Sequence, residues 1–85
     1  MVVFQLNKMT IQEQVKQIVA ESLEVDANTL DCNKELFEME SYDSMRSVII
    51  LSKIEETFDV MIPEDDIFDI TTINEWAAEI EKIKN

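Results

Sequence analysis

The sequence predicts an all-α protein, a small antiparallel bundle of three to four helices with a long first loop. The 85 residues include no glycine and one proline, which argues against tight β-hairpin turns and glycine-rich phosphate loops. Hydrophobic residues make up 46% of the chain, enough for one core but not for a second domain. They recur at three- and four-residue intervals, which is the period of an amphipathic helix.

Two capping boxes mark the expected starts of the first and last helices. In a capping box, a Thr hydroxyl accepts a hydrogen bond from the third helical amide, and a Glu side chain reaches back to the Thr amide. This spacing occurs from Thr10 to Glu13 and from Thr72 to Glu75. The apolar stripes that follow predict one helix over residues 10–23 and another from residue 72 to the C-terminus.

A middle helix is expected over residues 45–58, because Asp43 and Ser44 are both common N-caps. A short acidic helix over residues 64–70 is expected after it, with Pro63 near the first position. The long loop should then cover residues 24–43. Its apolar residues are expected to anchor it to the core; they are Val25, Leu30, Leu36 and Phe37.

The middle helix has two apolar faces, and a small bundle can bury only one of them in its core. Ile50, Ile54 and Phe58 share one face, edged by Ser47 and Leu51. We expect this face to point inward. A second face, with Ser52 at its edge, is expected to be exposed beside Ser44, where a partner would bury it; it carries Met45, Val48 and Ile49. The alternative is that the bundle buries both faces.

The charge of the chain excludes several classes of partner. Seven Lys and Arg residues face 19 Asp and Glu residues, which gives a net charge of −12. Phosphates of nucleic acids and of anionic membranes repel such a chain, so basic proteins are the expected partners. An acidic run is either a solvated face or a surface that steers basic partners; it comprises Glu64, Asp65, Asp66 and Asp69.

Composition also predicts where the chain lies and how it is organised. Residues 1–9 are expected to form an N-terminal tail and residues 10–85 a single domain. The first six residues lack the features of a signal peptide, and no run of 18 apolar residues occurs. Cys32 has no second cysteine to pair with, which fits a reducing compartment. We therefore expect a cytoplasmic protein, and a monomer because of its size and negative charge.

Catalysis and metal binding are not expected. The chain has no histidine, so it cannot form a Ser-His-Asp or Cys-His relay, and it lacks the commonest transition-metal ligand. An EF-hand loop needs a central glycine, which is also missing.

Asp43 and Ser44 are the candidate functional pair, because they lie where the long loop meets the start of the middle helix. Free amides and the helix dipole stabilise an anion at such a position. A serine hydroxyl there is a favourable place to attach a phosphate group. The alternative is that Asp43 or Ser44 only caps the helix.

The segment from residue 42 to residue 66, YDSMRSVIILSKIEETFDVMIPEDD, resembles the acyl carrier protein family, as does ITTINEW at residues 70–76. In that family an Asp-Ser-Leu or Asp-Ser-Met triplet opens the second helix. An apolar and acidic helix, Glu-x-x-Phe, a short β-branched run, Ile-Pro and an acidic patch follow in order. The resemblance extends over residues 10–84.

The resemblance implies that a phosphopantetheinyl transferase attaches 4′-phosphopantetheine from coenzyme A to Ser44, with Asp43 positioning the serine. Acyl groups would then be carried as thioesters on the thiol of this arm. Acyl-loading and acyl-processing enzymes with basic docking patches would perform the chemistry. The residues expected to bind these partners are Met45, Arg46, Val48, Ile49, Glu55 and Glu56.

The sequence departs from the family pattern near Ser44. The family usually has a glycine just before the Asp-Ser pair, where this chain reads Glu40-Ser41-Tyr42. Arg46 and Ile49 stand where fatty-acid members are often acidic. The differences on the middle helix favour a dedicated polyketide or fatty-acid-like pathway over housekeeping fatty-acid synthesis. The alternatives are an aminoacyl or peptidyl carrier of nonribosomal type and a non-carrier acidic helical adaptor.

Overall fold

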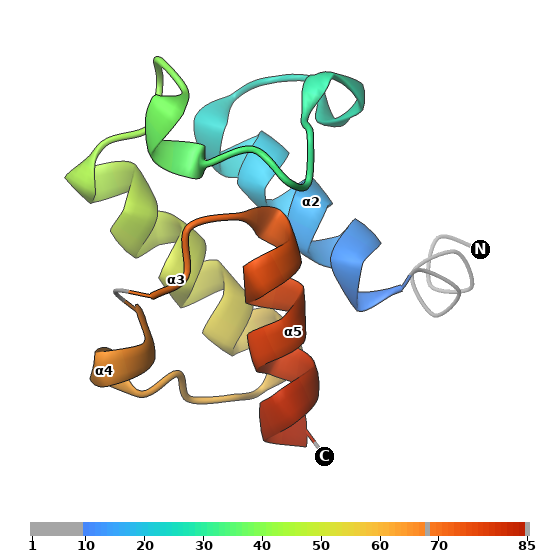
Figure 1. The fold of residues 1–85 in the computed structure, drawn as a ribbon, viewed down its shortest axis with the longest axis vertical. Helices are drawn as coiled ribbons and strands as arrows, with labels where there is room; N and C mark the ends of the chain where they lie inside the picture. The colour runs from blue at the N-terminus through green and yellow to red at the C-terminus, as the bar shows by residue number, and fades with distance from the viewer. Residues whose placement is uncertain (1–9, 68, 85) are drawn as a thin grey trace.

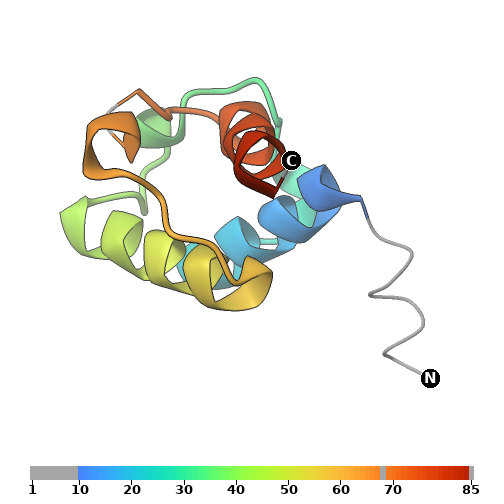
Figure 2. The same cartoon turned by 90° about the horizontal axis from the view of Figure 1, so that it is seen from below.

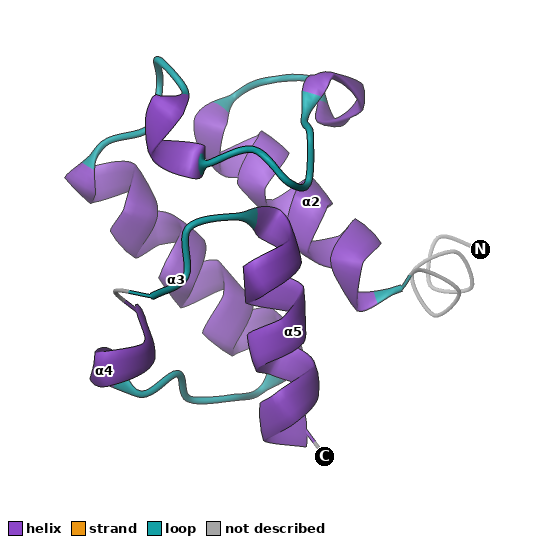
Figure 3. Cartoon of the chain, viewed as in Figure 1, coloured by secondary structure: helices purple, strands orange, loops and turns teal. Residues whose placement is uncertain are grey.

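Helices account for all the regular structure in a computed structural model that describes residues 10–67 and 69–84 (Figure 3). No strand occurs in these two ranges, so the expected all-α class is confirmed. The expected tail of residues 1–9 lies outside them. The elements in chain order are α2 (Ile11–Leu23), the 3-10 turns η1 (Ala27–Thr29) and η2 (Leu36–Glu38), α3 (Ser44–Phe58), α4 (Glu64–Ile67) and α5 (Ile73–Lys84).

Helix α2 lies against both α3 and α5 and runs in the opposite direction to them (Figure 1). Helix α4 lies at the edge of the bundle away from α2 (Figure 2). It begins where the acidic helix is expected but ends at Ile67 rather than at residue 70. Within the described ranges, no helix is both long enough and apolar enough to cross a membrane.

Both expected capping boxes are present. At α2, the Thr10 Oγ1 accepts from the Glu13 amide at 3.1 Å, and the Glu13 Oε1 accepts from the Thr10 amide at 3.2 Å. At α5, the Thr72 Oγ1 accepts from the Glu75 amide at 3.1 Å. The Glu75 carboxylate accepts in return from the Thr72 amide and, at 2.7 Å, from the Thr71 amide. These hydrogen bonds, that from the Thr71 amide above all, lower the pKa of Glu75.

Two helices end without glycine, as a chain with no glycine requires. Glu24 after α2 and Asp59 after α3 have left-handed φ angles of 58° and 55°. The amides of Val25 and Val60 then bond back to carbonyls five residues earlier, at 3.0 and 3.2 Å. This six-to-one hydrogen bond belongs to the Schellman motif, which satisfies carbonyls that the helix end leaves free.

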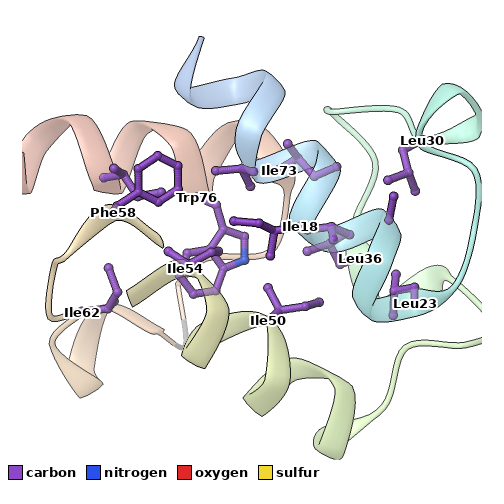
Figure 4. Packing of buried hydrophobic residues seen from close by; sticks show 14 residues of the cluster. Ile18, Leu23, Leu30, Leu36, Ile50, Ile54, Phe58, Ile62, Ile73 and Trp76 are labelled. Atoms are coloured by element: carbon purple, nitrogen blue, oxygen red, sulfur yellow. The ribbon is translucent and has the colours of Figure 1, made fainter. Parts of the chain in front are cut away.

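The core lies where α2, α3 and α5 meet, and Figure 4 shows its side chains interdigitating around Trp76. The face of α3 expected to point inward does so, because Ile50, Ile54 and Phe58 are 1%, 0% and 7% exposed. Ser47 and Leu51 are half-buried at its edge.

The 24–43 loop is anchored by Leu30 and Leu36, which are both buried, while Val25 is half-buried. Its backbone is also tied to the start of α5, since the Leu36 amide donates to the Thr71 carbonyl at 2.8 Å. The expectation that Phe37 anchors the loop is wrong: this side chain is 63% exposed. In the three-residue turn η2, the Leu36 side chain points into the core, so the side chain of the adjacent Phe37 points away from the core.

Asp66 in α4 lies close enough to Glu79 in α5 to affect its titration. A hydrogen bond with the Asp66 side chain raises the pKa of Glu79, and partial burial adds to this effect. One acid of the expected acidic run is therefore engaged within the bundle, whereas Glu64 and Asp65 are exposed.

Candidate functional site

The candidate site lies where the 24–43 loop enters α3. Asp43 is extended, with φ −147° and ψ −177°, and its Oδ1 accepts a hydrogen bond from the Arg46 amide at 2.8 Å. Its carbonyl accepts the first helical bond, from the Ser47 amide at 2.9 Å. Asp43 is therefore the N-cap, and Ser44 is the first residue of the helix. The cap does not use the Ser44 hydroxyl.

Ser44 is exposed, and so is its neighbour Met45. The Ser47 hydroxyl donates a hydrogen bond to the backbone carbonyl of Ser44 at 2.7 Å. This bond involves the Ser44 backbone and not its hydroxyl. Because α3 is 15 residues long, its N-terminus carries the partial positive charge of a full helix dipole. A phosphate group on this hydroxyl would add negative charge where the helix favours it, without displacing a buried side chain.

The turn before Ser44 is made without glycine. Glycine is usual just before the Asp-Ser pair in the family that the sequence resembles, and this chain has Glu40-Ser41-Tyr42 there. The Tyr42 amide donates to the Met39 carbonyl at 3.1 Å. Glu24 and Asp59 are the residues with positive φ in the described ranges. The chain therefore turns into α3 through ordinary backbone conformations, and glycine is not needed in this segment.

Arg46 connects the start of α3 to the end of α2. One guanidinium nitrogen donates to the Ser22 carbonyl, and the other donates to the Glu24 carboxylate at 3.1 Å. A cation is favourable at the C-terminal end of a helix, where carbonyls are unpaired. Arg46 was expected to bind a partner, but its charge is already engaged within the chain.

The other expected partner-binding residues are three apolar residues, described first, and two acids. Met45, Val48 and Ile49 are 72%, 60% and 36% exposed, and we call them the outer strip of α3. Their exposure confirms the expected orientation of the helix and shows that the alternative, burial of both faces, is wrong.

The two acids of this set differ in their surroundings. Glu55 is half-buried, and its Oε2 accepts from the Ile62 amide at 2.9 Å. Glu56 is exposed. No group of three or more potential metal ligands occurs in the part of the chain that the structure describes.

Comparison with known proteins identifies the family. Residues 13–80 match the family model described as "Phosphopantetheine attachment site". The chain is 35% identical over 72 residues to an acyl carrier protein of Helicobacter hepaticus, covering 85% of this chain and 95% of that protein. It is 32% identical over 76 residues to one of Campylobacter lari, covering 89% and 99%. Over 74 residues it is 31% identical to one of Bdellovibrio bacteriovorus, covering 87% and 95%.

The chain belongs to the acyl carrier protein family. It is therefore a carrier protein and not an enzyme, and its prosthetic group is 4′-phosphopantetheine. Members of the acyl carrier protein family interact with a phosphopantetheinyl transferase and with acyl-processing enzymes. Ser44 is exposed at the start of α3, a position where the helix end favours an anionic group.

Proposed function

We propose that Ser44 carries the phosphopantetheine arm and that the protein presents acyl groups as thioesters on its thiol. The observation that supports this assignment most is that one residue caps α3 and a different residue exposes its hydroxyl at the start of the helix. Asp43 supplies the cap, and the adjacent Ser44 is exposed as the first helical residue. In this proposal Asp43 positions Ser44, because the cap fixes the backbone from which the hydroxyl projects.

The attachment is a phosphoryl transfer for which the transferase supplies the catalytic groups. The Ser44 oxygen forms a bond to the phosphorus of the phosphopantetheine group, and the pyrophosphate bond of coenzyme A breaks. Adenosine 3′,5′-bisphosphate leaves, and the hydroxyl proton passes to a base on the transferase. This chain contributes an accessible oxygen and a helix end that favours the phosphodiester charge.

The outer strip of α3 is the proposed docking surface for the transferase and for enzymes that load or process the acyl group. Exposed apolar side chains beside the attachment serine can be buried by a partner. Glu56 and the net charge of −12 would attract basic patches around that contact. Arg46 and Glu55 support this surface from within, through their bonds to α2 and to Ile62.

We also propose that the carrier serves a dedicated fatty-acid-like or polyketide pathway. Arg46 and Ile49 stand at two positions on α3 that are often acidic in the fatty-acid members which the sequence resembles. An apolar Ile49 and an internally paired Arg46 give this helix a less acidic face near Ser44. Partners selected by that face would differ from enzymes that recognise an acidic one.

The test is the intact mass of the protein after incubation with coenzyme A, Mg²⁺ and a broad-specificity phosphopantetheinyl transferase. We expect the wild type to gain the mass of one phosphopantetheine group and Ser44→Ala to gain nothing. Ser52→Ala, which removes another exposed hydroxyl from α3, is the matched control and should be modified like the wild type. An unmodified wild type, or a Ser44→Ala variant that still gains the mass, would contradict the assignment.

A further inference from the structure

We propose that the phosphopantetheine arm, when it is not engaged by an enzyme, docks in an open groove between the end of α2 and the 24–43 loop. This inference rests on the proposed attachment at Ser44. The groove has a volume of about 730 Å³, within the range of roughly 300–1,000 Å³ that holds small-molecule ligands. Its walls come from Leu23 to Val25 on one side and from Lys34 and residues 38–41 on the other.

The segments that line the groove, at the end of α2 and in the loop before α3, lie at the same end of the bundle as the start of α3, where Ser44 is the first residue (Figure 1). Ser41, in its wall, is three residues before Ser44, so the two Cα atoms are at most about 11 Å apart. On the other side of Ser44, Arg46 is bonded at 3.1 Å to Glu24, which also lines the groove. Chain segments on both sides of the attachment serine thus connect it to the groove, and a flexible arm on Ser44 can reach it.

The lining matches the chemistry of the arm. Pantetheine carries a gem-dimethyl group, a hydroxyl and two amides before its thiol. Leu23, Val25 and Met39 offer apolar surface to the dimethyl group, and the first of these is buried. The Lys34 ammonium can donate to an amide carbonyl, and the Ser41 hydroxyl can accept from an amide nitrogen.

The same lining disfavours the acyl chain as the occupant. Glu24, Glu38 and Glu40 are exposed carboxylates in the walls. A hydrocarbon chain in this groove would take water from these charged groups without offering them a hydrogen bond. The arm offers them amide and hydroxyl donors instead. Docking would hold the thiol beside the 24–43 loop until a partner on the outer strip of α3 draws the arm away.

The first test is nuclear Overhauser spectroscopy on the wild-type protein carrying the arm. We expect contacts between the gem-dimethyl protons of the arm and the side-chain methyls of Val25 and Met39. Contacts only with residues of α3, α4 or α5, or no contacts beyond Ser44 and Met45, would overturn the groove assignment. The intact mass of the same sample separates the two proposals, because a protein that never gains the arm contradicts the attachment at Ser44 instead.

The second test measures the alkylation rate of the arm's thiol by iodoacetamide in a Cys32→Ala background, where it is the single thiol. Val25→Asn should expose the arm and raise this rate about threefold, the equivalent of about 0.65 kcal/mol. Val60→Asn is a matched control: both valines are half-buried, follow a left-handed residue and make the same helix-ending hydrogen bond. Equal rates in the two variants would overturn the proposal. If Val25→Asn does not fold, as judged by circular dichroism, the wild-type contacts decide.

Discussion

The two faces of α3 carry similar apolar side chains, but one face is buried in the core and the other is exposed. Ile50, Ile54 and Phe58 are at most 7% exposed because they belong to the core cluster, together with residues of α2 and α5, whereas Met45 and Val48 are more than half exposed. Burial converts the hydrophobicity of the first face into folding free energy. The outer strip stays exposed, and in the proposed function its hydrophobicity serves association with a partner. On this helix, the angular position of an apolar residue, rather than its type, determines whether it is buried in the core or exposed to a partner.

Truncation of one residue on each face should show the largest difference. We expect Ile54→Ala to lower the free energy of unfolding by about 3 kcal/mol, because it leaves a cavity at a position with 0% exposure. Val48→Ala should change it by less than about 0.5 kcal/mol, because that side chain is 60% exposed. Urea denaturation followed by circular dichroism measures both values. Losses of similar size would mean that the two faces are not distinct.

Periodicity was sufficient to predict both faces. An α-helix turns by a fixed angle per residue, so the spacing of Ile50, Ile54 and Phe58 places them on one side whatever they pack against. The helix starts were equally local, because a capping box forms between residues three positions apart. Asp43 and Ser44 could be selected for the same reason, although the sequence left open which of them caps α3.

Long-range contacts and short turns were less accessible to sequence reasoning. The bond from Arg46 to Glu24 joins residues 22 positions apart, and no local spacing specifies such a pair. Glu55 bonds to Ile62 across the end of α3, which depends on how the chain turns at Asp59. Phe37 was misassigned because a 3-10 turn has no sustained period from which to choose its inward residue.

A charge placed on the outer strip should affect recognition and leave stability almost unchanged. We expect Val48→Glu to lower kcat/KM for modification by the transferase about tenfold, or about 1.4 kcal/mol, because an apolar contact would become a buried charge. Thr57→Glu adds the same charge at an exposed position further along α3 and should leave kcat/KM within about twofold of wild type. A tenfold loss in both variants would indicate a general effect of charge.

Glu55 and Glu56 are neighbours on α3 and extend the comparison to polar groups. Here we expect the smallest difference in the free energy of unfolding. Glu55→Ala should lower the free energy of unfolding by about 1 kcal/mol, because the amide of the buried Ile62 loses its charged acceptor. Glu56→Ala should stay within about 0.5 kcal/mol of wild type and should instead slow the association of a basic partner at low salt. Paired urea denaturations and stopped-flow association rates separate these outcomes. If Glu56→Ala were the more destabilising variant, the division of α3 into a supporting face and a recognition face would not extend beyond its apolar residues.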